Sequence, residues 1–187
     1  MNISLTILKK TQKKLDFRTI EITFVIHETE DIDKFLSHLF EIFGLSDTDF
    51  SIKKTEGHHG NIIQLIRAHL IRDRVPEITN KILSSINVTD LKTINNDLLY
   101  YLDDKFTLYL RFNKQDIIDN ILTLSYYDSV RIKMKPKIKL NKDKNLKEVE
   151  RMISIITEIR SFKNELNIGP GSFIDISIEK INKKNNG

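Results

Sequence analysis

Strict alternation of apolar and polar residues marks three stretches of the chain, residues 18–27, 106–112 and 129–138. Because successive side chains of a strand point to opposite faces of a sheet, each stretch predicts a half-buried strand. Pro136 predicts that the far end of the last strand lies at a sheet edge. The core-facing residues are expected to be Ile20, Ile22, Phe24 and Ile26, then Phe106, Leu108, Leu110 and Phe112, then Val130, Ile132, Met134 and Ile138.

Other segments show the helical period. A helix is expected over residues 30–43, capped by Thr29 and ended by Gly44. The remaining predicted helices cover residues 76–86, 89–102, 114–120 and 146–166, and the remaining predicted strands cover 50–54, 62–71, 122–126 and 173–179.

Strands and helices mix without a regular β-α-β-α order, which favours the α+β class. We therefore expect a mostly antiparallel sheet with helices packed on one face and the other face open. Residues 1–139 are interpreted as one α+β domain. A linker at 140–145 would join it to a helix–strand extension with a basic tail, residues 146–187.

Composition narrows the class of protein. The chain has 187 residues and no cysteine, which excludes disulfides and thiolate metal sites. It has no apolar run of membrane-spanning length, and its first residues lack the pattern of a secretory signal. These features predict a cytoplasmic protein with no membrane partner. The net charge of +4 suggests a polyanionic partner, although a chain rich in Ile, Lys and Asn can also reflect an AT-rich genome.

The positive charge is concentrated on the last alternating strand. Arg131, Lys133, Lys135 and Lys137 occupy its outward positions. Their spacing of about 6.5–7 Å is close to that of phosphates along an RNA strand. Unpartnered, these charges repel one another, so an anionic ligand is favoured. The alternative is a solvated face with carboxylates on the neighbouring strand.

A second group of candidates follows residue 108. Tyr109 and Arg111 are outward positions of a predicted strand, and Lys114 and Gln115 begin a helix. Tyrosine can stack on a base, arginine can pair with phosphate, and amides at a helix start favour anions. Alternatively, Tyr109 packs under a loop.

The loop Thr55–Asn61 joins two predicted strands and carries His58 and His59 between glycines. Adjacent imidazoles in a turn diverge, so we expect no metal site here. His58, His59 and Asn61 are instead candidates for RNA contact, or simply an exposed hairpin tip. Nearby cations are Arg67, Arg72 and Arg74. The alternative for Arg72-Asp73-Arg74 is an ion-pair cluster that neutralises itself.

Four blocks together resemble a small archaeal RNA-binding family. They are E-G-H-H-G-N (56–61), R-D-R (72–74), L-Y-L-R-F-N-K-Q (108–115) and D-S-V-R-I-K-M-K (128–135). Members of that family are described as predicted exosome subunits. The resemblance covers about residues 18–139 and implies a fold like that of the ribosomal protein that contacts 5S rRNA. The chain departs from the family pattern at Ile62, usually Pro, which is expected to loosen the turn, and at Asn113, usually Asp, which removes a negative charge.

A shorter block, I-R-S-F-K-N-E-L-N-I-G-P-G (159–171), resembles the anticodon-binding region of valine-type class I aminoacyl-tRNA synthetases. No synthetase catalytic motif accompanies it. The prediction is thus a non-catalytic RNA-binding protein without cofactor or metal, an accessory factor of RNA processing or degradation associated with the exosome. Two alternatives stay open. One is a protein–protein adaptor in an RNA-processing or ribosomal assembly, and the other is a metal nuclease using His58 and His59.

Overall fold

The computed structural model describes residues 17–57, 60–137, 146–147, 150 and 153–154. Its elements follow the predicted order closely. They are the strands β1 (Phe17–His27), β2 (Phe50–Glu56), β3 (Ile62–Ile71), β4 (Leu108–Asn113) and β5 (Ser129–Pro136), the helices α2 (Ile32–Phe43), α3 (Arg74–Ser85), α4 (Val88–Asn96) and α5 (Lys114–Ile118), and the 3-10 turns η1 (Asp47–Asp49) and η2 (Leu98–Tyr101).

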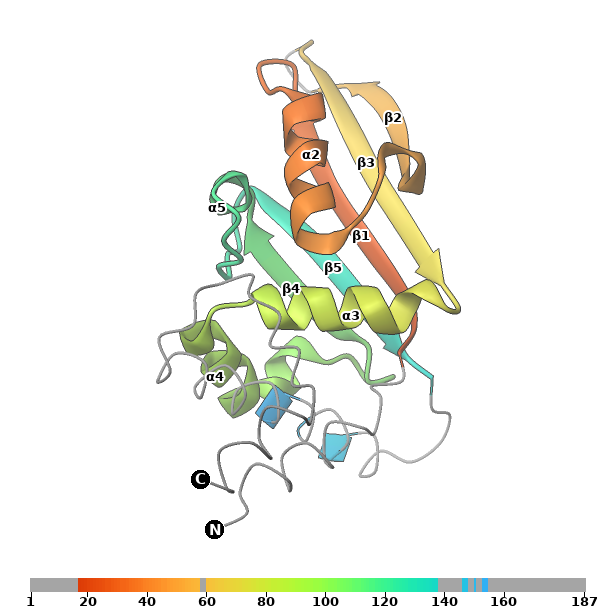
Figure 1. The fold of residues 1–187 in the computed structure, drawn as a ribbon. Helices are drawn as coiled ribbons and strands as arrows, with labels where there is room; N and C mark the ends of the chain where they lie inside the picture. Colours follow the sequence, from red (N-terminus) through yellow and green to blue (C-terminus); the bar gives the residue numbers. More distant parts are fainter. Residues whose placement is uncertain (1–16, 58–59, 138–145, 148–149, 151–152, 155–187) are drawn as a thin grey trace, which may run out of the picture.

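The five strands form one sheet in the order β2-β3-β1-β5-β4, and every neighbouring pair is antiparallel. Helices α2 and α3 lie against the same face of this sheet (Figure 1). The architecture is therefore α+β with helices packed on one face, as the mixture of periodicities predicts.

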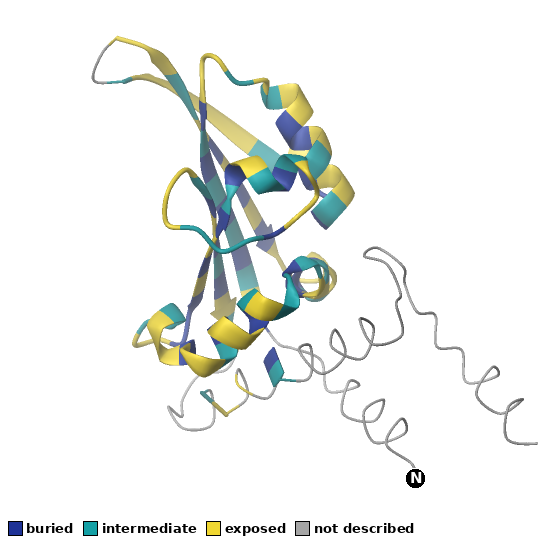
Figure 2. Ribbon diagram, turned by 90° about the vertical axis from the view of Figure 1, so that its left-hand side faces the viewer, coloured by how far each residue is buried: buried dark blue, intermediate teal, exposed yellow. Residues whose placement is uncertain are grey.

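The core lies between the sheet and these helices. Ile22 on β1, Leu110 on β4 and Ile132 on β5 are essentially inaccessible, and so are Leu39 and Ile82 of the covering helices. Figure 2 shows buried and exposed residues alternating along the strands. The alternation read from the sequence thus assigns the core face of β1, β4 and β5 correctly.

Helix α2 begins later than predicted. Asp31, not Thr29, is its N-cap, because the Asp31 carboxylate accepts a hydrogen bond from the Lys34 amide at 3.0 Å. The predicted end of the helix at Gly44 is confirmed. Gly44 adopts φ 71°, a left-handed conformation that glycine tolerates best, and its amide donates to the Phe40 carbonyl.

The helix predicted over residues 89–102 is wrong as a continuous element. Helix α4 ends at Asn96, and Asp97, at φ −111° and ψ 32°, leads into the separate turn η2. Three consecutive short polar residues, Asn95 to Asp97, are poor helix formers and account for the break. This break changes the direction in which the Tyr100 and Tyr101 side chains point.

Three strand details also differ from expectation. The segment 122–126 makes only single bridges, Ile86 to Leu122 and Phe112 to Leu124. Thr107, expected to point outward, precedes β4 and is buried. Strand β5 lies inside the sheet rather than at its margin, but its pairs with β4 run only as far as Leu108–Met134. Pro136 lies beyond that last pair, where an absent amide donor is tolerated.

Residues of the predicted C-terminal extension contact the sheet and its helices. Leu146 lies against the core, Ile153 is fully buried in it, and the Ser154 hydroxyl donates to Asn95 Oδ1 of α4 at 3.1 Å. The predicted arm before residue 17, most of the helix 146–166, the strand 173–179 and the basic tail lie outside the described residues. No helix in the described part of the chain is both long and apolar enough to cross a bilayer.

Candidate nucleic-acid interface

The face of the sheet opposite α2 and α3 carries most of the candidate cations. Residues that pair directly across antiparallel strands share a face, so the register places these side chains together. The row Ser51–Arg67–Thr23–Arg131–Arg111 crosses all five strands, and His69–Glu21–Lys133–Tyr109 runs beside it. We call the cations of this surface the basic face: Lys53, Arg67, Arg111, Arg131, Lys133 and Lys135.

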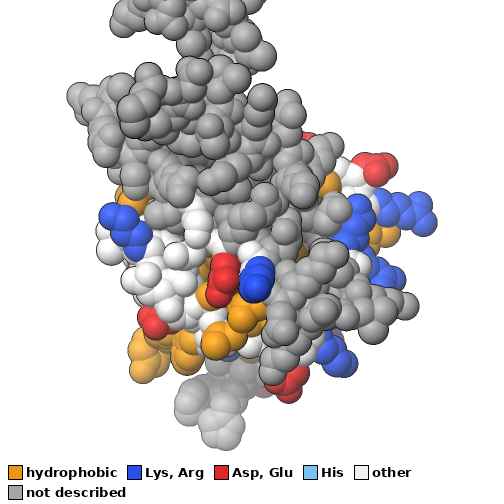
Figure 3. Space-filling view, turned by 90° about the horizontal axis from the view of Figure 1, so that it is seen from below, with side chains coloured by type: hydrophobic (Ala, Val, Ile, Leu, Met, Phe, Trp, Pro, Cys, Tyr) orange, Lys and Arg blue, Asp and Glu red, His pale blue; other side chains and the backbone are white. Residues whose placement is uncertain are grey.

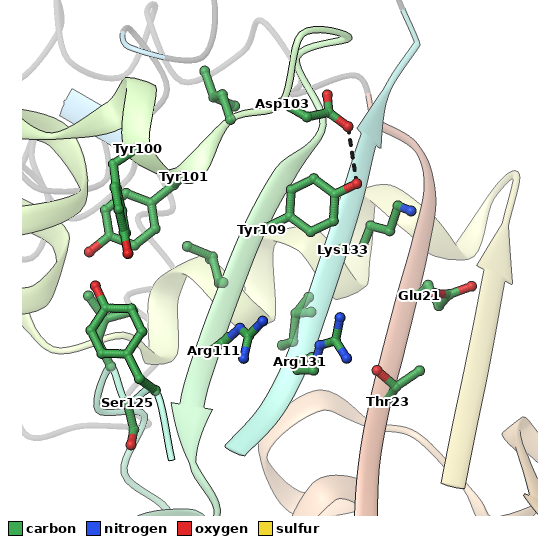
Figure 4. Close-up of a pocket in the computed structure, with 15 residues that line it drawn as sticks. Glu21, Thr23, Tyr100, Tyr101, Asp103, Tyr109, Arg111, Ser125, Arg131 and Lys133 are labelled. Carbon is green, nitrogen blue, oxygen red and sulfur yellow. Dashed lines mark hydrogen bonds between the residues drawn. The ribbon is translucent and has the colours of Figure 1, made fainter. Parts of the chain in front are cut away.

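Within the basic face, Arg111 and Arg131 are direct cross-strand partners. Side chains in such positions have Cβ atoms about 4.5–5.5 Å apart, and like charges there destabilise the sheet. Both arginines are exposed, and Figure 4 shows their guanidinium groups side by side. The free protein therefore holds two positive charges close together.

Carboxylates do not neutralise this surface among the described residues. The ion pairs found there involve Lys114, Arg74, Lys81 and His38, none of which belongs to the basic face. Glu21 is the acidic residue in these strand rows, and it sits opposite Lys133 without forming an ion pair with it. Figure 3, seen from below, shows most of the visible Lys and Arg side chains toward the right of the view, with some at its left and centre.

Tyr109 joins the cations through two contacts. The Lys133 ammonium lies 5.2 Å from the centre of the Tyr109 ring, a cation–π distance. The Tyr109 hydroxyl donates to Asp103 Oδ2 at 3.0 Å (Figure 4). Tyr109 is therefore held by contacts with Lys133 and Asp103, and about a third of its surface stays exposed.

Asp103 links the Tyr109 side chain to the backbone of the loop before β4. Burial alone would raise the pKa of the Asp103 carboxyl, but amide donors from Thr107 and Lys105 and the Tyr109 hydroxyl outweigh burial and lower it. Its Oδ1 accepts from the Lys105 amide at 2.8 Å and from the Thr107 amide at 2.9 Å. Asp103 is thus ionised and engaged, and it orients Tyr109.

A groove of about 550 Å³ opens along β4 and β5 on this face. Arg111, Arg131, Lys133 and Tyr109 contribute to one part of its lining, and Glu21 and Thr23 of β1 line the far side. Tyr100 and Tyr101 form the opposite wall (Figure 4). Tyr126, which packs on Tyr100, belongs to the same wall. We call this feature the tyrosine groove.

Local structure explains how Tyr126 reaches the groove. The segment after α5 runs along the outer edge of β4, where the Asn113 amide donates to the Thr123 carbonyl at 2.8 Å and the Ser125 amide to the Arg111 carbonyl at 2.9 Å. These bonds place Tyr126 beside Arg111. On the other side, the break after α4 turns Tyr100 and Tyr101 toward the same space.

The three wall tyrosines contact one another edge to face. The Tyr100 and Tyr101 ring centres are 5.4 Å apart at 87°, and those of Tyr100 and Tyr126 are 6.4 Å apart at 78°. Hydrogen bonding to Tyr100 raises the pKa of the Tyr126 hydroxyl to about 12, and burial raises the pKa of Tyr101. The Tyr101 and Tyr126 hydroxyls are thus neutral at physiological pH. Tyr100 and Tyr126 stay 68% and 60% exposed.

Sequence reasoning missed this wall, although a signal was present. All five tyrosines of the chain fall between residues 100 and 127. Every one of them except Tyr127 lines the tyrosine groove. Such clustering of one aromatic type is a usable indication of a surface site. It was overlooked because residues 89–102 were predicted to form one continuous helix.

Lys114 requires a correction. It was expected to contact RNA, but it is only 3% exposed. Its ammonium donates to the Val25 carbonyl at 3.0 Å and pairs with Glu30 at 2.9 Å and Asp128 at 2.7 Å. Its positive charge is therefore neutralised by these two carboxylates within the fold.

The Arg72-Asp73-Arg74 cluster also differs from its interpretation. Arg74 forms a two-pronged ion pair with Asp49 on η1 rather than with Asp73. Hydrogen bonding to Arg74 lowers the pKa of Asp49. Arg72 is exposed, with φ 57°, at the turn between β3 and α3.

The remaining candidates lie apart from the groove. His58 and His59 are outside the described residues, and Asn61 is exposed near the tip of the β2–β3 hairpin. Gln115 is exposed at the start of α5, and Lys137 is exposed just beyond β5. In the described ranges, no three His, Asp or Glu side chains gather in a way that could hold a metal ion.

Comparison with known proteins assigns the chain to a family. The sequence model of a family described as RNA binding matches residues 19–138, well over half of the chain. The chain belongs to this RNA-binding family. RNA-binding protein PAB1135 of Pyrococcus abyssi is 30% identical over 107 residues, which cover 54% of this chain and 70% of that protein.

Solved structures support the fold of the RNA-binding family member. A protein from Sulfolobus solfataricus is 25% identical, with 73% of this chain and 97% of that chain covered and a TM-score of 0.59. A protein from Methanothermobacter thermautotrophicus is 21% identical, with 75% and 98% covered and the same TM-score.

The similarity to a valine-type synthetase is short. The valine–tRNA ligase of Pelagibacter ubique is 55% identical over 49 residues, which are 26% of this chain and only 6% of the ligase. The chain thus spans a small fraction of that enzyme.

Asn113 and Ile62, the two positions expected to depart from the family pattern, both lie in regular local structure. Asn113 is the N-cap of α5, and its side-chain oxygen accepts from the Gln115 amide at 2.8 Å and the Asp116 amide at 3.2 Å. Asparagine and aspartate serve this role about equally well. Ile62 pairs with Glu56, so the hairpin ladder reaches this position rather than opening early.

Proposed function

We propose that this chain binds RNA through the basic face. The observation that carries the proposal is the Arg111–Arg131 pair. These two guanidinium groups face each other across β4 and β5, and no carboxylate of the described chain pairs with either. A phosphate placed between them removes the repulsion. Membership of the RNA-binding family and the likeness to PAB1135 support RNA as the source of that phosphate.

The layout of the basic face favours the shape and charge of the backbone over base sequence. Along β5, Arg131, Lys133 and Lys135 are spaced by about 6.5–7 Å. Across the sheet, Arg67 and Arg131 flank Thr23 on the same row, about 9–10 Å apart. A grid of this kind can follow phosphates along a strand. Phosphate contacts give affinity and position but little sequence information.

We propose a binding role without catalysis. Asp103 is the best-placed candidate acid of the groove. Its carboxylate is ionised and already accepts hydrogen bonds from the Tyr109 hydroxyl and two backbone amides. The competing hypothesis, a nuclease using His58 and His59, is tested by incubating labelled RNA with the protein, with and without added divalent metal or chelator. Metal-dependent cleavage that His58→Ala abolishes would replace the binding proposal.

The family resemblance also supports a cellular role as a cytoplasmic accessory factor of RNA processing or degradation, associated with the exosome. Copurification of RNA-degrading subunits from native cells tests this role. If subunits are retained only while RNA is intact, the chain acts through RNA. Retention after nuclease treatment favours the adaptor alternative.

The binding proposal itself is tested by titrating a labelled structured RNA with the full chain at several salt concentrations. Each neutralised phosphate steepens the fall of log K with log salt by about 0.7–0.9. We expect a steep linear decline. An affinity that does not change with salt contradicts phosphate binding by the basic face.

A further inference from the structure

The tyrosine groove has the size and composition of a ligand site rather than of a flat electrostatic surface. Its volume of about 550 Å³ falls within the range of about 300–1,000 Å³ typical of small-molecule sites. A surface that only followed phosphates would need cations but no aromatic wall. The groove therefore calls for a ligand with both an anionic and a flat apolar part.

The wall is built to leave ring faces open. Tyr100 and Tyr126 meet at 78°, so one ring's edge meets the other's face. Their ring centres are 6.4 Å apart, so the two rings pack on each other. The rings are held in place, yet both stay well over half exposed. A fixed, exposed aromatic face is what a nucleobase stacks on.

The groove is lined by three cations and two acidic residues. Arg111, Arg131 and Lys133 line it next to the wall, while Asp103 is engaged and Glu21 lies across on β1. The Ser125–Arg111 backbone bond holds the residue before Tyr126 against β4 at Arg111, and both Tyr126 and Arg111 line the groove. An aromatic face and a pair of cations thus adjoin each other.

We propose that the tyrosine groove binds an unpaired RNA nucleotide, with its base stacked on the Tyr100–Tyr126 wall and its phosphate held between Arg111 and Arg131. The inference rests on the proposed function and adds the class of RNA, which is single-stranded or looped-out. Bases of an intact duplex are stacked on each other and cannot reach the wall, whereas splayed bases can.

The absence of tryptophan makes the groove directly observable. Intrinsic fluorescence of this chain comes from five tyrosines, and all but Tyr127 line the groove. An oligouridine of about ten nucleotides, within the usual site sizes of about 4–16, is titrated into the full chain at low salt. A G·C-rich RNA duplex of the same length, which stays paired at the salt used, is the comparison at equal phosphate concentration. We expect the single strand to quench tyrosine emission and the duplex to leave it nearly unchanged.

Matched variants locate the contact. Tyr126→Ala removes a wall ring, and Tyr127→Ala removes its neighbour, which is 85% exposed and does not line the groove. We expect Tyr126→Ala to weaken oligouridine binding by about 5- to 100-fold and Tyr127→Ala to leave it unchanged. Tyr100→Ala, at a second highly exposed ring, should reproduce the loss and guards against a folding defect of one variant.

The outcomes separate the two proposals. If the chain binds neither probe, both proposals fail. If it binds RNA with a steep salt dependence but prefers the duplex, or if Tyr126→Ala and Tyr127→Ala behave alike, the nucleotide groove is wrong while the basic face stands. Loss of single-strand binding in Tyr126→Ala and Tyr100→Ala, with duplex binding unchanged, supports the groove.

Discussion

Arg111 on β4 and Arg131 on β5 occupy directly opposite positions on the open face of the sheet, with no carboxylate of the described chain paired to either. The arrangement has a cost in the free protein, because like charges in a cross-strand pair destabilise a sheet. The same arrangement favours an anion between the two groups. Stability and binding should therefore respond in opposite directions when one charge is removed.

Arg131→Gln is expected to stabilise the free protein by about 0.2–1 kcal/mol at low ionic strength. The gain should shrink as salt screens the repulsion. Urea unfolding at low and high salt measures it. Added inorganic phosphate should raise the stability of the wild type more than that of the variant. A variant that is less stable at low salt would show that Arg131 has a stabilising partner in the free protein.

Substitution of Lys114 is expected to have the reverse effect, a loss of stability with unchanged RNA affinity. Its ammonium is buried and bound to Glu30, Asp128 and the Val25 carbonyl. Lys114→Met should therefore lower the free energy of unfolding by about 1–3 kcal/mol, because charged hydrogen bonds are lost and their acceptors remain.

RNA affinity of folded Lys114→Met should equal that of the wild type, since the lysine does not reach the basic face. Lys133→Met is the matched control, with a similar change in chemistry at the surface, and should lose affinity while keeping stability. A loss of affinity in Lys114→Met, measured at a temperature where it is folded, would return Lys114 to the binding residues.

The Asp49–Arg74 pair predicts a pH effect. Hydrogen bonding to Arg74 lowers the Asp49 pKa below its ordinary value of 3.8. A carboxyl with a lowered folded-state pKa stabilises the fold above its unfolded pKa and loses that contribution as pH falls through the folded one. Asp49→Asn should thus cost about 1 kcal/mol at neutral pH and nothing once the pH is below the lowered pKa.

Thermal unfolding of wild type and Asp49→Asn from neutral to acidic pH checks this expectation. The two stability curves should converge on acidification, beginning near pH 3.8. Asp47→Asn, at an exposed position of the same turn, is the control and should follow the wild type. A constant gap between the curves would mean that the ion pair is not the source of the difference.

Periodicity was enough to predict the strands that form the site. Arg131 and Lys133 alternate with buried Ile132 and Met134, so their outward direction follows from the pleat alone. The cross-strand partner of each cation could not be read this way. Register is a long-range property, and the pairing of Arg111 with Arg131 joins segments separated by α5 and the segment that follows it.

Long-range contacts also explain the wrong prediction for Lys114. Its position at a helix start suggested an anion site, but Glu30, 84 residues earlier, supplies the anion. The tyrosine wall was missed for a local reason. Apolar spacing continued through residue 102, while the polar run Asn95 to Asp97 ended the helix and turned Tyr100 toward the groove.

The central claim is that RNA binds the basic face, and a comparison of two double variants tests it most directly. Arg111→Gln with Arg131→Gln removes two charges from the basic face, and Lys34→Gln with Lys92→Gln removes two exposed charges from α2 and α4. Affinity for one structured RNA is measured at several salt concentrations. We predict that the arginine variant, which loses the one phosphate shared by the pair, flattens the salt slope by about 0.7–0.9 and that the lysine variant keeps the wild-type slope. Equal slopes for both variants would contradict binding at the basic face.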